Sequence, residues 1–182
     1  MRISVVLIFA LLFSINNSFA QKYMTKNGHI RFFSSTPLEN IEAHNRQVNS
    51  ALDVSTGDFV FKVLIKSFEF EKALMQEHFN ENYMESDKFP NASFNGKVTN
   101  ISSITHTKDG TYNADVEGKL TIHGVTKDIK EKGTFTVKDG VIQGFSKFNV
   151  KVADYEIKIP GAVVNNIAES IEVTVDVKLE KL

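Results

Sequence analysis

The chain of 182 residues carries 21 basic and 22 acidic side chains, and 42% of its residues are hydrophobic. A formal net charge of −1, with no interleaving of basic and aromatic residues, excludes an electrostatic surface for nucleic acid or for an anionic membrane. The sequence contains no cysteine, so disulfides and thiolate metal sites are excluded and stability must come from packing.

The first twenty residues have the pattern of a secretory signal peptide. Arg2 precedes an apolar run from Ile3 to Phe13, and Ser18-Phe19-Ala20 forms an A-x-A-like cleavage site before Gln21. The run is shorter than the roughly 20 apolar residues of a membrane-spanning helix, and no other stretch approaches that length. We therefore predict an exported, soluble protein with one domain over residues 21–182, a formal net charge of −2 and no stable membrane insertion.

Two strands are expected before the turn at Thr56-Gly57-Asp58. The segment 28–35 alternates as a strand, with Ile30 on one face and Arg31 on the other. Because both faces carry an aromatic residue, the pattern does not decide which face points inward. A second strand over residues 41–54 is expected to contain a kink or bulge at Asn45-Arg46.

A short helix is expected between two strands in the segment 59–94. Residues 59–65 alternate with the odd positions facing the core. From Glu71 to about Met84 the apolar spacing becomes helical, and Pro90 forbids continuation. The inward side of this helix is expected to carry Leu74, Met75, His78, Phe79, Asn82 and Tyr83.

The clearest strand runs from Thr111 to His123, after an Asp109-Gly110 pair that favours a hairpin turn. Apolar or small residues alternate with polar ones along its whole length. Thirteen residues extend roughly 43 Å at about 3.3 Å each, whereas a globular strand usually has about five or six residues. This length favours a tall, strongly coiled barrel over a compact sandwich.

Three more segments alternate as strands, over residues 125–137, 142–152 and 171–179, with a turn at Lys138-Asp139-Gly140 and a long connection over 154–166. Antiparallel strands with short turns predict an all-β fold with one short helix, in an up-and-down antiparallel β-barrel of about eight strands. A barrel of this size can enclose one small ligand. The helix is then expected to cover one side or end of the barrel.

Three segments resemble the YceI-like family: FNENYMESDKFPNASFNGKV after the helix, VEGKLTIHGVTKDI in the long strand pair, and the C-terminal IEVTVDVKL. The resemblance covers nearly the whole chain after residue 20. It implies a lipocalin-like β-barrel, exported to the periplasm in Gram-negative bacteria, that binds polyisoprenoids or other long amphiphilic chains in an internal apolar tunnel. The family is not established as catalytic, so the resemblance implies no enzymatic activity. The chain has no Trp, so the G-x-W signature of true lipocalins is absent and the likeness to them is architectural.

The first functional hypothesis is a carrier for a long-chain isoprenoid or acyl lipid, including an isoprenoid quinone. Burying such a chain contributes about 0.8 kcal/mol per CH₂, so an apolar tunnel needs no special motif. The candidate lining residues, for each of which ordinary core packing is the competing interpretation, are Phe59, Phe61, Phe68, Phe79, Phe94, Tyr112, Leu120, Phe135 and Phe148.

Arg31 and Glu131 are candidates for contact with a lipid head group. A charge on an inward strand position costs several kcal/mol unless it is paired or reaches water. The alternative for each is a position open to solvent at the end of a strand.

The second hypothesis is an enzyme and the third is a non-catalytic interaction module that uses a sheet edge or an exposed aromatic patch. The sequence has no G-x-S-x-G motif, and its histidines lack the spacing of metal ligands. We therefore expect no catalytic residue, metal or cofactor. A homodimer is compatible with the carrier and with the interaction module. The histidines are His29, His44, His78, His106 and His123.

Overall fold

The computed structural model describes residues 21–182, and the predicted signal peptide lies outside them. The strands are β1 (Lys22–Ser35), β2 (Asn40–Asp53), β3 (Asp58–Leu64), β4 (Phe68–Phe70), β5 (Asn91–Val98), β6 (Gly110–Ile122), β7 (Val125–Lys138), β8 (Val141–Lys151) and β9 (Ser170–Lys181). Helix α1 (Ala73–His78) continues as a π-helical segment, η2 (Phe79–Tyr83). Short 3-10 turns are η1 (Ile65–Ser67), η3 (Ile101–Ser103), η4 (Val152–Tyr155) and η5 (Gly161–Val163).

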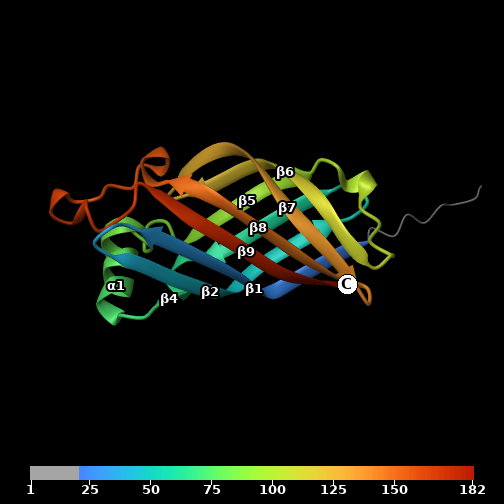
Figure 1. The fold of residues 1–182 in the computed structure, drawn as a ribbon, viewed down its shortest axis with the longest axis horizontal. Helices are drawn as coiled ribbons and strands as arrows, with labels where there is room; N and C mark the ends of the chain where they lie inside the picture. Colours follow the sequence, from blue (N-terminus) through green and yellow to red (C-terminus); the bar gives the residue numbers. More distant parts are fainter. Residues whose placement is uncertain (1–20) are drawn as a thin grey trace, which may run out of the picture.

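Eight of the strands form a closed antiparallel barrel (Figure 1). The order around the wall is β1-β9-β8-β7-β6-β5-β3-β2, and β1 pairs with β2 to join the two edges. The short strand β4 pairs with β2 as a ninth strand. The predicted all-β architecture with one short helix and about eight barrel strands is confirmed.

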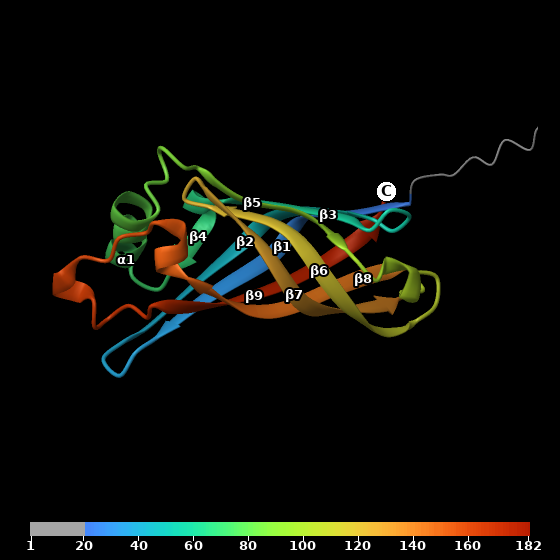
Figure 2. The same cartoon turned by 90° about the horizontal axis from the view of Figure 1, so that it is seen from above.

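The two ends of the barrel carry different elements (Figures 1 and 2). At the terminal end lie both ends of the described chain and the turns that join β2 to β3 and β7 to β8. At the opposite end, here called the α1 end, lie α1, the tips of the β1–β2 and β6–β7 hairpins, and the connection of residues 152–169 between β8 and β9.

Two tight turns set the register of the long strands. His123 and Gly124 have φ values of 51° and 76° between β6 and β7, and Asp139 and Gly140 have φ values of 51° and 77° between β7 and β8. Two consecutive positive φ values are typical of the type I′ turn, whose twist matches that of the flanking strands. The turn at Lys138-Asp139-Gly140 was expected from the sequence.

The predicted hairpin turn at Asp109-Gly110 is wrong. Gly110 is the first residue of β6, and residues 99–109 form a longer connection from β5. The side chain of Asn100 stabilises this connection, because its amide donates to the carbonyl of Asn113 at 2.9 Å and its oxygen accepts the N–H of Asp115 at 2.9 Å. The connection also buries Ile104, which a two-residue turn would not supply.

The predicted irregularity in the second strand is confirmed. Gly28 pairs with Val48, whereas Ile30 pairs with Asn45, so β2 has additional residues opposite β1 at this point. The buried Asn45 amide donates to the carbonyl of Leu64 at 2.8 Å, and its oxygen accepts a backbone N–H at 2.9 Å. A β-bulge of this kind increases strand twist and helps the sheet to close.

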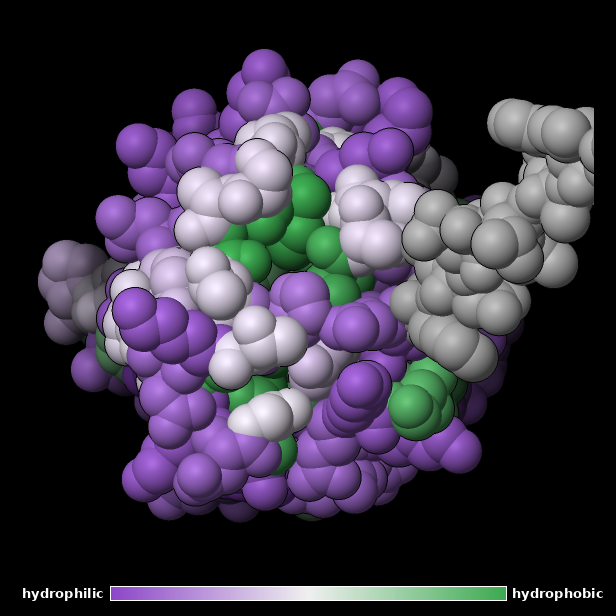
Figure 3. All heavy atoms as spheres, turned by 90° about the vertical axis from the view of Figure 1, so that its right-hand side faces the viewer, coloured by the Kyte–Doolittle hydropathy of each residue, from purple (hydrophilic) through white to green (hydrophobic). Residues whose placement is uncertain are grey.

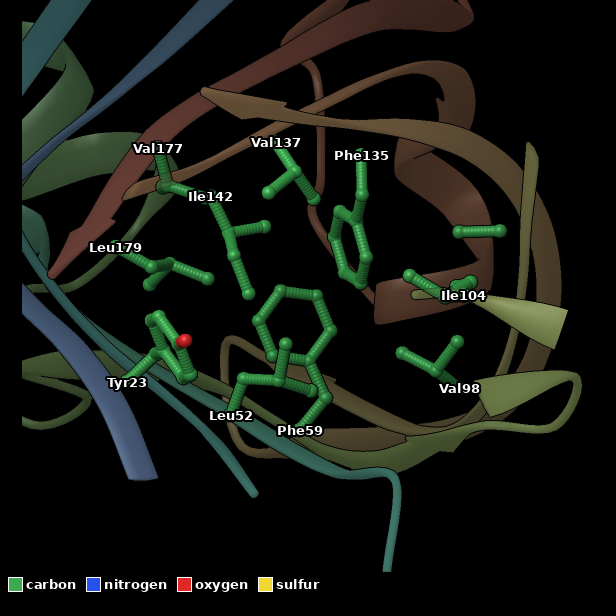
Figure 4. Packing of buried hydrophobic residues seen from close by; sticks show 11 residues of the cluster. Tyr23, Leu52, Phe59, Val98, Ile104, Phe135, Val137, Ile142, Val177 and Leu179 are labelled. Atoms are coloured by element: carbon green, nitrogen blue, oxygen red, sulfur yellow. The ribbon is translucent and has the colours of Figure 1, made fainter. Parts of the chain in front are cut away.

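Buried side chains fill the terminal end of the barrel (Figure 4). Seen from outside, this end is mostly hydrophilic around a small hydrophobic area (Figure 3). We call the buried side chains inside this end the terminal cluster, and its members are Tyr23, Leu52, Phe59, Val98, Ile104, Ala114, Phe135, Val137, Ile142, Val177 and Leu179.

We predict that Gly118→Ala destabilises the protein by about 1–3 kcal/mol, the usual cost of overpacking. A Cβ at Gly118 would lie 2.6 Å from the carbonyl oxygen of Asn95 and 2.9 Å from the ring of Phe94. Gly161→Ala is the matched control, since nothing lies within 4 Å of its added Cβ. Equal thermal unfolding midpoints for the two variants would contradict this close packing of β5 against β6.

Candidate ligand cavity

A cavity of about 400 Å³ occupies the barrel between the terminal cluster and the α1 end. Its lining is almost entirely apolar and comes from all eight barrel strands, from α1 and η2, and from the connection of residues 152–169. Pockets for small molecules are typically about 300–1,000 Å³ and mostly apolar. The cavity therefore has the size and chemistry of a site for an apolar molecule.

Burial along β9 shows where packing gives way to the cavity. Leu179 and Val177 are 0% and 1% exposed in the terminal cluster. Val175, Val173 and Ile171 continue the same inward face, but they are only half-buried and they line the cavity. Because the strand keeps its alternation throughout, this change reflects a lack of packing partners inside the barrel.

Eight of the nine residues predicted to line a tunnel do line this cavity: Phe59, Phe61, Phe68, Phe79, Phe94, Leu120, Phe135 and Phe148. Phe59 and Phe135 also belong to the terminal cluster, with ring centroids 5.7 Å apart, and they form the floor of the cavity. Contact of any of these residues with a lipid stays a prediction.

Tyr112 lies elsewhere. Its side chain packs against the terminal cluster, and its hydroxyl donates to the carbonyl of Lys108 at 3.0 Å. It faces inward as its position in β6 requires, but it lies on the terminal side of the cavity floor.

Four phenylalanine rings pack together on the wall near the α1 end. Phe79 of η2 lies 5.3 Å from Phe32, 5.6 Å from Phe68 and 5.0 Å from Phe70 between ring centroids. Phe32 also lies 5.5 Å from both Phe68 and Phe70. Phe32 is a lining residue that the sequence pattern did not single out, because β1 has an aromatic residue on each face. The available signal was its alternation with Ile30 and Ser34, which also line the cavity.

The helix covers the cavity less tightly than its pattern predicts. Met75, His78, Phe79 and Tyr83 line the cavity, but Leu74 is 60% exposed, so its predicted inward position is wrong. No residue of α1 is buried, because the six-residue helix rests over a hollow instead of a packed sheet. Burial raises the pKa of the Tyr83 phenol above its usual value.

Hydrogen bonds join the β1–β2 hairpin to the connection of residues 152–169. The Ser34 hydroxyl accepts the N–H of Ala168 at 2.8 Å, and the Asn166 amide donates to the Glu39 carboxylate at 3.1 Å. Ser34, Glu39 and Asn166 are thus polar lining residues whose contacts hold the covering elements of the α1 end together.

Arg31 lies on the outer face of β1, opposite to the cavity-lining Ile30 and Phe32, so the inward position considered for it is not found. Its guanidinium lies 2.6 Å from Glu42 and 3.4 Å from Glu172. The hydrogen bond from Arg31 lowers the pKa of the Glu42 carboxyl.

Glu131 lines the cavity from β7. Burial is the only cause that raises the pKa of its carboxyl, which indicates an apolar setting without a charged partner close enough to matter. Of the two head-group candidates, Glu131 alone lies at the cavity.

No group of three or more metal-ligating side chains is arranged to hold a metal ion in residues 21–182. The same part of the chain contains no helix with the length and apolarity needed to cross a membrane.

The fold and cavity define a class, the small antiparallel β-barrels with an internal apolar cavity. A comparison with family models matches residues 18–179 to the YceI-like domain. The chain therefore belongs to the YceI-like family. No curated protein matches its sequence.

Solved structures share the fold at low sequence identity. A polyisoprenoid binding domain from Saccharophagus degradans superposes with a TM-score of 0.76 and 14% identity, covering 90% of this chain and 99% of that domain. BcnA from Burkholderia cenocepacia gives 0.68 and 12%, covering 84% and 95%. A YceI protein from Campylobacter jejuni gives 0.57 and 17%, covering 76% and 82%.

We predict that Glu131→Gln becomes more stable relative to the wild-type protein as the pH rises. The pKa of Glu131 is raised in the folded state, so ionisation costs the wild-type protein stability as the pH rises above about 4.5. The unfolding temperature of the variant relative to wild type should therefore increase between about pH 4 and pH 8. Glu117→Gln, on the outer face of β6, is the control, and an offset for Glu131→Gln that does not change with pH would contradict the prediction.

Proposed function

We propose that this protein is an exported carrier that holds one long-chain amphiphile in the barrel cavity, with a polyisoprenoid, an isoprenoid quinone or a fatty-acid-like lipid as the ligand. The observation that carries the proposal is the cavity of about 400 Å³ with its nearly continuous apolar lining. Each buried CH₂ of such a ligand contributes about 0.8 kcal/mol, so ten methylenes supply about 8 kcal/mol, and a longer chain is needed to offset the cost of association and still reach micromolar affinity.

The position of the cavity supports a carrier. The terminal cluster stabilises one end of the barrel, whereas the α1 end is covered by elements with few buried side chains. A ligand chain can fill the hollow without disrupting that core. A polyisoprenoid binding domain is also among the structures that share this fold.

Export to the periplasm, or secretion in an organism without one, is part of the proposal. It rests on the signal-peptide pattern of residues 1–20 and on the absence of cysteine, which leaves folding independent of the redox state of the compartment.

We propose binding in preference to catalysis. Of the polar residues that line the cavity, Ser34, Glu39 and Asn166 are engaged in contacts that hold the barrel elements together. These contacts give the three side chains a structural role in closing the α1 end.

The test is to express the full chain with export, purify the protein without detergent, and examine it by native mass spectrometry followed by extraction into organic solvent. A long-chain lipid at one equivalent per chain is expected. A protein that emerges empty and gains no thermal stability from prenyl or acyl ligands would exclude the carrier, and turnover of such a lipid would favour the enzyme.

We predict that Phe79→Asp reduces the retained lipid severalfold, because it removes one aromatic ring from the cavity wall and introduces a carboxylate among the three that remain. Glu81→Gln is the matched control on the exposed side of η2. The extracted lipid per folded chain is measured after circular dichroism has established that both variants fold. Equal retention by the two would remove this wall from the binding site.

A further inference from the structure

The barrel wall has an opening between β7 and β8. Strand β7 pairs with β6 from Val125 to Val137, but it pairs with β8 only from Gly133 to Lys138. Strand β8 meanwhile pairs with β9 as far as Lys151. Residues 125–132 of β7 and 147–151 of β8 therefore border a region without backbone pairing, here called the side opening, and Figure 2 shows the two ribbons diverging toward the α1 end.

Specific contacts frame both ends of the side opening. At its inner end the Ser146 hydroxyl donates to the carbonyl of Lys132 at 2.7 Å. At its outer end Nδ1 of His123 lies 3.2 Å from the carbonyl oxygen of Tyr155, and Nε2 lies 2.8 Å from the Glu85 carboxylate. The side opening is thus a bounded slot in the wall, and the strands do not simply fray there.

A second hollow of about 360 Å³ lies at the side opening. Five residues line both this hollow and the main cavity, so the two adjoin through the wall: Leu120, Ile129, Glu131, Phe148 and Val150. The other lining residues are polar except for the ring of Tyr155, and they are Lys127, Asp128, Asn149, Lys151, Asp154 and Tyr155. The passage is therefore apolar on the inside and polar on the outside, which matches an amphiphile.

The charges around the side opening nearly cancel. Asp128 lies 3.0 Å from Lys119, which neutralises it. Lys127, Lys151 and Asp154 line the same hollow as the inward Glu131. With Glu131 ionised, two lysines and two carboxylates leave no net charge to attract an anionic head group, whereas a neutral oxygen can accept a hydrogen bond from a protonated Glu131, a form that burial favours by raising its pKa.

We propose that the side opening binds the polar end of the amphiphile, and that Glu131 determines specificity by favouring an uncharged hydrogen-bonding group such as an alcohol or a carbonyl. This inference rests on the proposed carrier function. The chain of the ligand lies in the main cavity, and its polar end reaches water between β7 and β8.

The position of the polar end is tested on the wild-type protein with a geranylgeraniol analogue that carries a diazirine beside its hydroxyl. After photolysis, peptide mapping should place the adduct in residues 127–131 or 148–155. Adducts confined to α1 and η2, at Met75 or Tyr83, would overturn the assignment of the side opening.

Head-group specificity is tested with geranylgeraniol, geranylgeranyl phosphate and geranylgeranylamine against wild type, Glu131→Gln, Glu131→Leu and the control Glu117→Gln. Wild type should bind the alcohol at least about tenfold more tightly than the phosphate. The alcohol should lose roughly fivefold in Kd with Leu at position 131, the usual effect of one hydrogen bond, and little with Gln, whose amide still donates.

The outcomes separate this inference from the carrier function. If none of the three probes binds, the carrier function itself fails. If all bind but neither head group nor residue 131 changes Kd, the carrier stands and the role of Glu131 is overturned. Tightest binding of the amine, lost in Glu131→Gln, would replace the uncharged head group by a cationic one and would also overturn the proposal.

Discussion

Strand β1 hydrogen-bonds to β2 on one side and to β9 on the other, and the rest of the structure depends on this double pairing. Without it the chain would form an open meander with two exposed edges and an accessible apolar face. With it, the inward positions of eight strands enclose a common interior. The bulge at Asn45 provides the additional twist that closure needs, and Asn45 is itself fixed by two hydrogen bonds.

A chain without disulfides must combine a packed core with an unfilled interior. It does so by dividing the barrel along its length. Residues such as Leu52, Ile142 and Leu179 are fully buried at the terminal end and stabilise the fold, while β8 and β9 run on toward the α1 end with inward side chains that are only half-buried around the cavity. The core thus lies beside the binding site and shares with it only the side chains where the two meet, such as Phe59 and Phe135.

Strand parity explains how much of this was predictable. Once a strand and its inward phase are known, an alternation with period two assigns every other residue to the interior, so six of the eight predicted lining residues followed from strand parity. The other two, Phe68 and Phe79, lie in β4 and η2. Strand parity did not identify the inward face of β1, because the face of Ile30 and the face of Arg31 each carry an aromatic residue. In the structure Arg31 lies on the outer face, where it pairs with Glu42 and Glu172. It also could not show that the segment before Gly28 continues β1 and places Tyr23 in the terminal cluster.

The sequence gives the least information about where two neighbouring strands stop pairing. Lys127 and Glu131 are the only interruptions of the inward apolar phase of β7. The pattern does not show that pairing with β8 stops at Gly133, because backbone pairing depends on where the neighbouring strand goes. The polar contacts at the outer end of the resulting opening come from three distant segments, at residues 85, 123 and 155.

His123 and Gly124 connect the turn geometry to this opening. Both residues have positive φ in the type I′ turn, and a side chain at Gly124 would meet the ring of Phe89 at 2.5 Å, so the hairpin tip fits closely against the loop before β5. This fit directs the His123 imidazole, whose ring centroid lies 4.6 Å from that of Phe89, toward Glu85 and Tyr155. His123, the histidine of the LTIHGVTK segment, therefore has a structural role. It fixes the outer end of the side opening, while Glu131 faces the interior.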